Sequence, residues 1–356
     1  MESGTATALH PPFAVWTRLA LLRAFCAVAE GAHVVASGGG DARAAAACVT
    51  AVLCDAQCRV CVLGGRLDMR RSLGSVLGGC IVRFLGGLRG VVSRVIETHS
   101  GNCAFGAAVT RDGSKLLVLF ARPFARPFRF HYAINVFRIG DGVLLRSFGE
   151  NGVGPLQFER PCDVCVLADD HVLITETGNR RVQILTPALH FQGFVGVGQL
   201  SDPTSACGDS DAIVVAQRRE FFIHVFRRHD GALLSCFGTS NHGDGQMHAP
   251  FGVCLIPVQR HIAVVDYLRS AVCVFTQEGK VVRRFGGYLL EYPYDITCSD
   301  SGDELIVADS DNKRVVVFSA AGELLKTIRT GWVRKVATHG STIFALTYSS
   351  GCLVLT

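Results

Sequence analysis

The chain has 356 residues, of which 49% are hydrophobic and 18% charged, so it can bury a large core and does not have the composition of a disordered segment. Most of its formal net charge of +5 arises in residues 1–100, which hold ten Arg and six acidic residues, whereas residues 101–356 hold 25 basic and 24 acidic residues. Overall charge therefore does not draw residues 101–356 to nucleic acid or membranes, although a local patch can.

Residues 1–90 carry no recognisable repeat, and we expect them to form an N-terminal extension. Residues 13–29 have the pattern of a short amphipathic helix that is too short and too charged to span a membrane. The Gly- and Ala-rich residues 37–49 are typical of a linker. The apolar runs that follow fit either an extra hairpin or a lead-in without regular structure, and the sequence does not decide between these.

From residue 91 onward the chain is built from a repeating hairpin. An apolar strand, a short polar turn and an alternating second strand end at Leu185, Phe226, Phe275 and Phe318, and a looser copy ends at Phe137. Successive ends lie 48, 41, 49 and 43 residues apart. Periods of this size indicate propeller blades or solenoid repeats.

The segments beside each hairpin add two more strands to the unit. A Pro-led or Phe-led segment precedes the hairpin, as in RPCDVCV and YPYDITC, and a strand ending in Phe-Gly follows it, as in VLLRSFG and VVRRFG. This pattern resembles the NHL-repeat family, and it is matched best from Arg160 to Gly196 and from Tyr292 to Phe318. Membership in that family implies a six-bladed β-propeller. The Trp-Asp dipeptide of WD-type repeats and the paired glycines of kelch repeats are absent.

Six blades account for residues 91–356. The five hairpins are followed by residues 332–355, which supply three further strands and no outer strand. Residues 91–96 (VVSRVI) resemble the outer strand VVRRFG of a later repeat, so we predict that they complete the last blade and remove its exposed edge. The predicted fold is all-β: an NHL-type propeller over 91–356, closed by strand 91–96, after the extension 1–90.

Fifteen cysteines do not form the pattern of a disulfide framework. Most fall on predicted strands where other repeats carry small residues, their number is odd, and no convincing secretion signal precedes them. Such cysteines behave as small buried hydrophobic residues in a reducing compartment. We therefore expect a cytoplasmic protein without a structural metal site or a cofactor.

The innermost strands are where six-bladed propeller enzymes generally build their sites. One position of these strands carries, in chain order, Gly106, Asp163, Ser205, Gly252, Asp295 and Lys335. The four polar members, Asp163, Ser205, Asp295 and Lys335, fit a polar ligand or a water cluster. They lack the oxygen ligands that calcium requires and the histidines that suit zinc, so we expect the carboxylates to cap backbone amides instead.

Surface charge is expected to divide between the two faces of the disc. The turns between second and third strands share one face with the connections between blades, and basic residues recur there, whereas acidic residues gather in the turns of the opposite face. We call the first of these the basic face. Its predicted partner-binding residues are Arg122, Arg126, Phe128, Arg129, Arg180, Arg218, Arg219, Arg269 and Lys313.

The insert ARPFARPFRFH, residues 121–131, is the most distinctive part of the basic face. Its prolines favour an extended loop, which holds the aromatic rings and guanidinium groups apart. Rings can stack on bases or fill a partner's pocket, and guanidiniums bind phosphate or carboxylate. The alternative interpretation is a tandem duplication whose phenylalanines cover the edge of the blade.

These observations favour a monomeric, non-catalytic recognition propeller over an enzyme. We expect a protein partner on the basic face, or single-stranded RNA as the alternative, and no membrane association. NHL propellers often serve as the recognition end of tripartite-motif ubiquitin ligases and RNA regulators, so the resemblance implies a link to ubiquitination or post-transcriptional regulation. The sequence has no RING pattern, so ligase activity would come from a partner. The competing class is a hydrolase or lyase with a site on the central axis.

Overall fold

A computed structural model describes residues 51–54, 60–63, 92–97, 103–123, 130–238, 246–348 and 351–356. The chain divides into two compact units, Met1–Gly86 and Gly87–Thr356. In the first unit, β1 (Ala51–Cys54) and β2 (Val60–Leu63) form an antiparallel hairpin. The helix expected over residues 13–29 and the linker expected over residues 37–49 lie outside the described residues.

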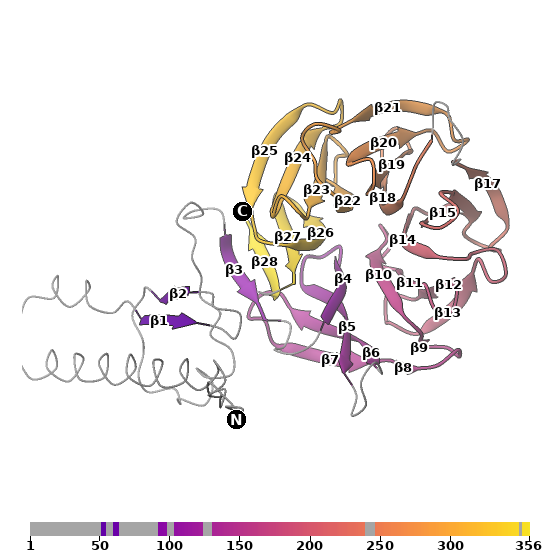
Figure 1. Ribbon diagram of the computed structural model, residues 1–356. Helices are drawn as coiled ribbons and strands as arrows, with labels where there is room; N and C mark the ends of the chain where they lie inside the picture. Colours follow the sequence, from indigo (N-terminus) through magenta and orange to yellow (C-terminus); the bar gives the residue numbers. More distant parts are fainter. Residues whose placement is uncertain are drawn as a thin grey trace, which may run out of the picture. The chain divides into compact units, whose positions relative to one another are not determined.

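The second unit consists of six four-stranded antiparallel sheets arranged as blades around a central axis (Figure 1). Blade one consists of β4 (Cys103–Val109), β5 (Lys115–Pro123), β6 (Phe130–Arg138) and β7 (Leu144–Phe148). Blade two consists of β10 (Pro161–Val166), β11 (Val172–Glu176), β12 (Arg181–Leu185) and β13 (Phe191–Val195). Blade three consists of β14 (Pro203–Gly208), β15 (Ala212–Gln217), β16 (Ile223–Arg227) and β17 (Leu233–Phe237).

Blade four consists of β18 (Pro250–Ile256), β19 (His261–Asp266), β20 (Ala271–Phe275) and β21 (Val281–Phe285). Blade five consists of β22 (Pro293–Cys298), β23 (Glu304–Asp309), β24 (Arg314–Ser319) and β25 (Leu324–Arg329). Blade six consists of β26 (Val333–His339), β27 (Thr342–Thr347), β28 (Gly351–Leu355) and β3 (Val92–Ile96). A short parallel pair, β8 (Glu150–Asn151) and β9 (Gln157–Phe158), joins blades one and two. The prediction of an all-β, six-bladed propeller is confirmed.

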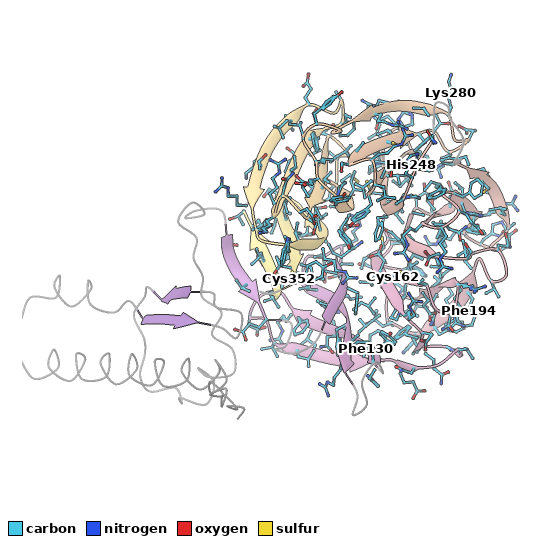
Figure 2. All side chains as sticks on the ribbon, viewed as in Figure 1. Phe130, Cys162, Phe194, His248, Lys280 and Cys352 are labelled. Carbon is cyan, nitrogen blue, oxygen red and sulfur yellow. The ribbon has the colours of Figure 1, made fainter. Side chains whose placement is uncertain are left out.

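The repeated apolar residue at the end of each third strand fills the space between neighbouring blades. Phe226, Phe275 and Phe318 are buried, and each packs in a cluster with side chains of the preceding blade. In blade two Leu185 takes this position and packs against blade one. Burying such a side chain contributes about 1.5–3 kcal/mol. The periodicity of the sequence therefore reflects packing between blades, whose side chains are drawn in Figure 2.

The sixth blade joins the two ends of the propeller. Its outer strand β3 precedes blade one in the sequence and pairs antiparallel with β28, with Ile96 opposite Cys352 (Figure 1). Ile96 is buried in a cluster with Leu116 of blade one and Leu346 of blade six. The ring is thus held by a strand pairing as well as by packing, and β28 presents no unpaired edge.

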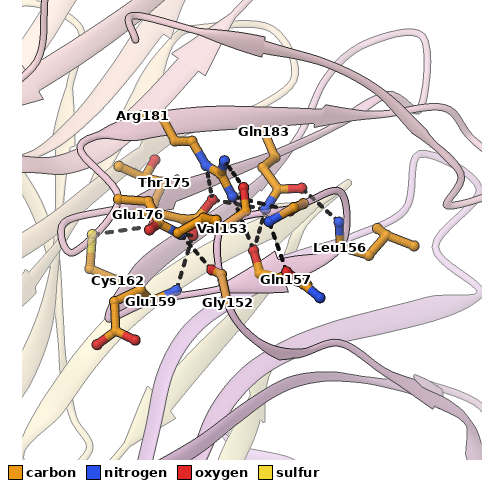
Figure 3. Close-up of polar contacts among 12 residues, drawn as sticks. Gly152, Val153, Leu156, Gln157, Glu159, Cys162, Thr175, Glu176, Arg181 and Gln183 are labelled. Atoms are coloured by element: carbon orange, nitrogen blue, oxygen red, sulfur yellow. Dashed lines mark hydrogen bonds and ion pairs between the residues drawn. The ribbon is translucent and has the colours of Figure 1, made fainter. Parts of the chain in front are cut away.

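A buried ion pair fixes the connection between blades one and two (Figure 3). The carboxylate of Glu176 accepts hydrogen bonds from Arg181 Nε at 2.7 Å, from Gln183 Nε2 at 2.8 Å and from the backbone N–H of Glu159 at 3.1 Å. Arg181 in turn donates to the carbonyl oxygen of Val153. These bonds tie the turn between β11 and β12 to the connecting segment, which sets the geometry of the basic face.

Two other blades fix the same turn with different residues. In blade five, Arg314 Nε donates to Asp309 at 2.6 Å, and Asp309 also accepts the backbone N–H of Glu291 at 2.7 Å. In blade four, Asp266 accepts the backbone N–H groups of His248 and Ala249 at 2.9 and 3.0 Å. These acidic residues serve to order the connections between blades, because their oxygens are already bonded to the backbone.

Candidate functional site

The four predicted axial polar side chains meet in one buried cluster. Lys335 Nζ on β26 lies 2.8 Å from Asp163 Oδ1 on β10 and 2.6 Å from Asp295 Oδ1 on β22. Ser205 on β14 donates its hydroxyl hydrogen to Asp163 Oδ2. Backbone N–H groups complete the cluster, since Val336 N donates to Asp295 at 3.0 Å. Four of the six inner strands are therefore linked across the axis.

Glycine occupies the equivalent position in the two remaining blades because space is short there. A Cβ atom on Gly252 would lie 2.6 Å from Asp295 Cα, and one on Gly106 would lie 2.9 Å from Val164 N. Both distances are shorter than non-bonded atoms tolerate. The two glycines thus let neighbouring inner strands approach, and this approach brings the axial carboxylates toward the ammonium group.

The protonation states of Lys335 and Asp295 depend on their contacts in this cluster, where Asp163 and Asp295 share the one ammonium group of Lys335. Burial alone would lower the pKa of Lys335, but the carboxylates of Asp163 and Asp295 outweigh burial and raise this pKa. Burial, together with Asp163, raises the pKa of Asp295 to about 6, against the opposing effect of Lys335. Lys335 thus stays charged at neutral pH, and its ammonium takes the place between the carboxylates that a metal ion would need. The described residues hold no group of three His, Cys, Asp or Glu side chains suited to a metal.

A cavity of about 250 Å³ lies directly above this cluster. Ser205 and Lys335 form part of its floor, while Thr177 and Arg218, from turns between second and third strands, stand at its rim. The cavity therefore opens on the basic face. Its wall receives one residue from each inner strand, immediately before the axial position, and these residues are Phe105, Cys162, Thr204, Phe251, Tyr294 and Arg334.

A register shift in every inner strand explains why two successive residues face the axis. The antiparallel pairing slips between Pro161 and Asp163, and the same shift occurs at the matching point of the other five blades. In a regular strand, successive side chains point to opposite faces, whereas a β-bulge re-aims a side chain. The bulge thus lets the axial residue enter the cluster while the residue before it lines the cavity.

Aromatic side chains form one side of the cavity and continue outward from it. The ring centroids of Phe251 lie 5.1 Å from Tyr267 and 5.0 Å from Tyr294, and those of Tyr267 and Tyr292 are 5.0 Å apart. Such spacing is typical of stabilising aromatic pairs. Burial raises the pKa of the neighbouring Tyr348 to about 12, so this phenol stays neutral. This side of the cavity is therefore built from packed aromatic rings that carry neutral phenol hydroxyl groups.

The guanidinium groups of the cavity differ in their partners. Arg218 forms an ion pair with Asp202 at 2.9 Å and lies 5.5 Å from the ring of Phe251. Arg334 lies 4.3 Å from the ring of Phe105 and 5.3 Å from that of Tyr348. Within the described part of the chain, no carboxylate forms an ion pair with Arg334. Cation–π contacts thus hold this partly buried guanidinium without neutralising it.

Cys162 is the thiol of the cavity, and its environment keeps it protonated. Its Sγ atom lies 3.2 Å from the hydroxyl of Thr177 and 3.2 Å from the carbonyl oxygen of Pro203. Burial raises the pKa of the Cys162 thiol to about 12 and outweighs the Thr177 hydrogen bond, which lowers this pKa. Because the thiolate is the nucleophilic form, Cys162 is unsuited to nucleophilic catalysis at neutral pH.

Of the predicted basic-face residues that the structure describes, only Arg218 lines the cavity. Arg122, Arg180 and Lys313 are exposed, and the side chain of Arg219 is 78% exposed. Arg269 is half-buried and donates to Gln246 and His248. Three of the predicted residues, Arg126, Phe128 and Arg129, lie outside the described residues.

The charge contrast between the faces is smaller than the sequence suggested. Glu159 and Glu291, in connections between blades, are exposed on the same face as the arginines. On the opposite face, several acidic side chains form ion pairs with arginines of other blades. These pairs are Arg228 with Asp169 at 2.7 Å, Arg260 with Asp209 at 2.7 Å, and Arg111 with Asp300 at 2.8 Å.

The sequence of this chain is similar to parts of two known proteins. No family model matches the chain. It is 28% identical over 179 residues to the Protein brain tumor of Drosophila melanogaster, and 38% identical over 61 residues to the RING finger protein nhl-1 of Caenorhabditis elegans. These matches cover 50% and 17% of this chain. The six-bladed propeller of this chain is therefore similar to NHL-repeat proteins. The matched regions make up 13% and 6% of the two relatives, so the chain spans only a small part of the length of each.

Solved structures with the same architecture include virginiamycin B lyases. A catalytically inactive form of the Staphylococcus aureus enzyme, solved with quinupristin, aligns over 74% of this chain and 87% of its own with a TM-score of 0.51 at 15% identity. A streptogramin B lyase aligns over 74% of this chain and 86% of its own with a TM-score of 0.50 at 15% identity. Likeness at this level extends to the fold alone. Among the residues that the structure describes, no helix has the length and apolarity needed to cross a membrane.

Proposed function

We propose that this NHL-type propeller is a recognition module that binds a protein partner on the basic face, around the mouth of the axial cavity. The observation that carries the proposal is a group of exposed aromatic and aliphatic side chains on that face, in blades four to six. Its members are Leu268, Tyr288, Leu289, Tyr292, Trp332 and Tyr348. Tyr, Trp and Arg supply most of the binding energy of protein interfaces, and exposed apolar patches mark such interfaces.

The arrangement of the rings around the cavity favours a protein over single-stranded RNA. Bases stack on open faces of aromatic side chains. Around the cavity, Phe251 packs against Tyr267 and Tyr294 and lies below Arg218, while Phe105 lies below Arg334. Because other side chains occupy these ring faces, the rings support the arginines and offer little surface to a base.

The catalytic alternative has less support from the axial groups. Lys335 lies between Asp163 and Asp295 and engages both carboxylates, and Cys162 is held as a thiol. Neither arrangement supplies a free base or an activated nucleophile. The resemblance to a RING finger protein supports ubiquitination as the setting of the recognition, with any ligase activity supplied by a partner. Post-transcriptional regulation is the alternative setting.

Alanine substitution on the basic face tests the proposal. Tyr288→Ala combined with Trp332→Ala should weaken partner binding roughly 1,000-fold, because each lost hot-spot side chain is worth about 2 kcal/mol, or roughly 30-fold. The matched control combines Val258→Ala on the opposite face with Leu325→Ala on β25, both of which remove exposed apolar side chains.

The measurement is affinity capture from cell extract with the full chain, followed by titration of the captured protein against each variant. A protein captured by the native chain and by the control, and lost with the face variant after RNase treatment, supports the proposal. A partner that is RNA, or a protein lost equally with both variants, contradicts it.

A further inference from the structure

We infer that the axial cavity receives a single acidic side chain of the partner protein, and that Arg334 binds its carboxylate. This inference rests on the proposed function, which it deepens by naming the chemistry that the cavity selects. Only some of the cationic groups at the cavity have a carboxylate partner among the described residues.

Of the four cationic residues that line the cavity, Arg160 and Arg334 form no ion pair among the described residues, and only Arg334 of these two is partly buried. Lys335 contacts Asp163 and Asp295, and Arg218 contacts Asp202. Arg334 is partly buried and forms no ion pair within the described ranges of the chain. A charge withdrawn from water is costly unless an opposite charge meets it. The residue is thus prepared for an anion that another molecule brings.

The two rings beside Arg334 fix its guanidinium for such a contact. Phe105 and Tyr348 lie 4.3 and 5.3 Å from its Cζ atom. Contacts through ring faces leave the N–H groups at the edge of the guanidinium available, and these groups match a carboxylate with two parallel hydrogen bonds. Since the rings restrict the side chain beforehand, little conformational entropy remains to be lost on binding.

The size and lining of the cavity select one side chain. A space of about 250 Å³ is below the range typical of small-molecule sites, and it is closed below by Ser205 and Lys335. The rings of Phe251 and Tyr294 offer apolar contact to methylene groups, and the hydroxyl of Thr204 stands beside them. The side chain of Glu or Asp fits this cavity, because its methylene groups can contact the aromatic rings while its carboxylate reaches Arg334.

The floor of the cavity distinguishes a carboxylate from a phosphate. Asp163 and Asp295 carry two carboxyl groups around the one ammonium of Lys335, so the cluster has no positive charge to spare when both are ionised. A doubly charged phosphate would be repelled by this floor more strongly than a singly charged carboxylate. The geometry therefore favours an unmodified acidic residue over a phosphorylated one.

A displayed library of random dodecapeptides, selected on the immobilised full chain, tests this inference. The native chain should enrich peptides with Glu or Asp at one fixed position relative to apolar residues. Selection on the Arg334→Met variant should retain the apolar pattern and lose the acidic preference. The control is Arg329→Met, an exposed arginine on the outer strand β25, which should select the same peptides as the native chain.

Fluorescence polarisation with one enriched peptide then measures the contact directly. Replacing its acidic residue by Gln should weaken binding to the native chain about tenfold to a hundredfold, the usual worth of a charge-assisted hydrogen-bonded pair. The same change should have little effect on binding to Arg334→Met, and Arg334→Lys should lie between the two. A phosphoserine at that position should bind less tightly than Glu.

The possible contrary results distinguish an error in this inference from an error in the proposed function. Enriched peptides that show no acidic preference, or that lose equal affinity on the Gln change with and without Arg334, would overturn the inference and leave the proposed function intact. Tighter binding of phosphoserine would overturn the choice of an unmodified residue. Absence of any enriched peptide that competes at the basic face would count against the proposed function itself. The peptide change needs no protein variant, so an unstable Arg334→Met chain would not obscure the result.

Discussion

At the scale of single residues, the axial cluster brings three buried charged groups into contact. Lys335 holds two buried carboxylates that belong to different blades. Buried ion pairs are not necessarily stabilising compared with an apolar core, but removing one partner leaves an uncompensated charge. The cluster therefore makes the packing of the inner strands depend on a single ammonium group.

Replacing Lys335 with Met should lower the free energy of unfolding by about 3–5 kcal/mol, because Asp163 and Asp295 lose their shared partner. Urea denaturation followed by circular dichroism measures this change. Lys326→Met, on the exposed outer strand β25, is the matched control and should alter stability by less than about 0.5 kcal/mol. Equal losses for the two variants would show that the ion pairs contribute nothing specific.

The raised pKa of Asp295 gives a distinct dependence on pH. Because this pKa is about 6 in the folded chain and 3.8 as its ordinary value, the folded state binds more protons than the unfolded state between those limits. This group therefore makes the free energy of unfolding increase as the pH falls from about 6 to about 4. Asn at position 295 cannot titrate, so Asp295→Asn removes the contribution.

Denaturation of the native chain and of Asp295→Asn across this pH window should show the difference. The stability of the native chain relative to the variant should grow as the pH falls, by at most about 1.4 kcal/mol per pH unit. The control is Asp303→Asn, which changes an exposed acidic residue in the β22–β23 turn. The stability of the native chain relative to this variant should not grow as the pH falls. A native chain that instead loses stability relative to Asp295→Asn on acidification would reverse the sign and refute the raised pKa.

At the scale of elements, β3 closes the ring. It supplies the outer strand of blade six, and Ile96 packs between blades six and one. The other five blades are each made of consecutive strands. Loss of β3 would expose the edge of β28 and remove a buried side chain at the junction where the ring closes.

Truncation tests the importance of β3. Deleting residues 1–97 should lower the melting temperature and broaden the unfolding transition, because blade six loses its outer strand and closure depends on packing alone. Deleting residues 1–80, which retains β3, should leave the melting temperature close to that of the full chain. Differential scanning calorimetry measures both, and similar melting temperatures for the two deletions would contradict a closing role for β3.

At the scale of the whole molecule, the two faces of the propeller are used differently. The face with the turns of Asp169, Asp209 and Asp300 carries ion pairs between blades, so its charges contribute to holding the ring together. The basic face carries the axial cavity and most of the large exposed aromatic side chains. This division, more than net charge, supports assigning recognition to the basic face.

Sequence reasoning reached the architecture because the propeller repeats its packing. Phe226, Phe275 and Phe318 recur at a regular spacing since each must fill the same gap against the preceding blade. The same alignment identified the axial position of each inner strand. Local packing demands that recur along the chain leave a period that can be counted without coordinates.

The tertiary structure alone decided what surrounds the axis. Strict strand alternation points the residue before the axial position away from it, and the bulge in each inner strand reverses that expectation for Phe251, Tyr294 and Arg334. The pairing of Lys335 with Asp163 and Asp295 likewise joins residues 172 and 40 positions apart. The sequence by itself determined the repeat and the number of blades, because these follow from periodic local packing. The cavity and its charges depend on backbone irregularities and on contacts between distant blades, which no period in the sequence records.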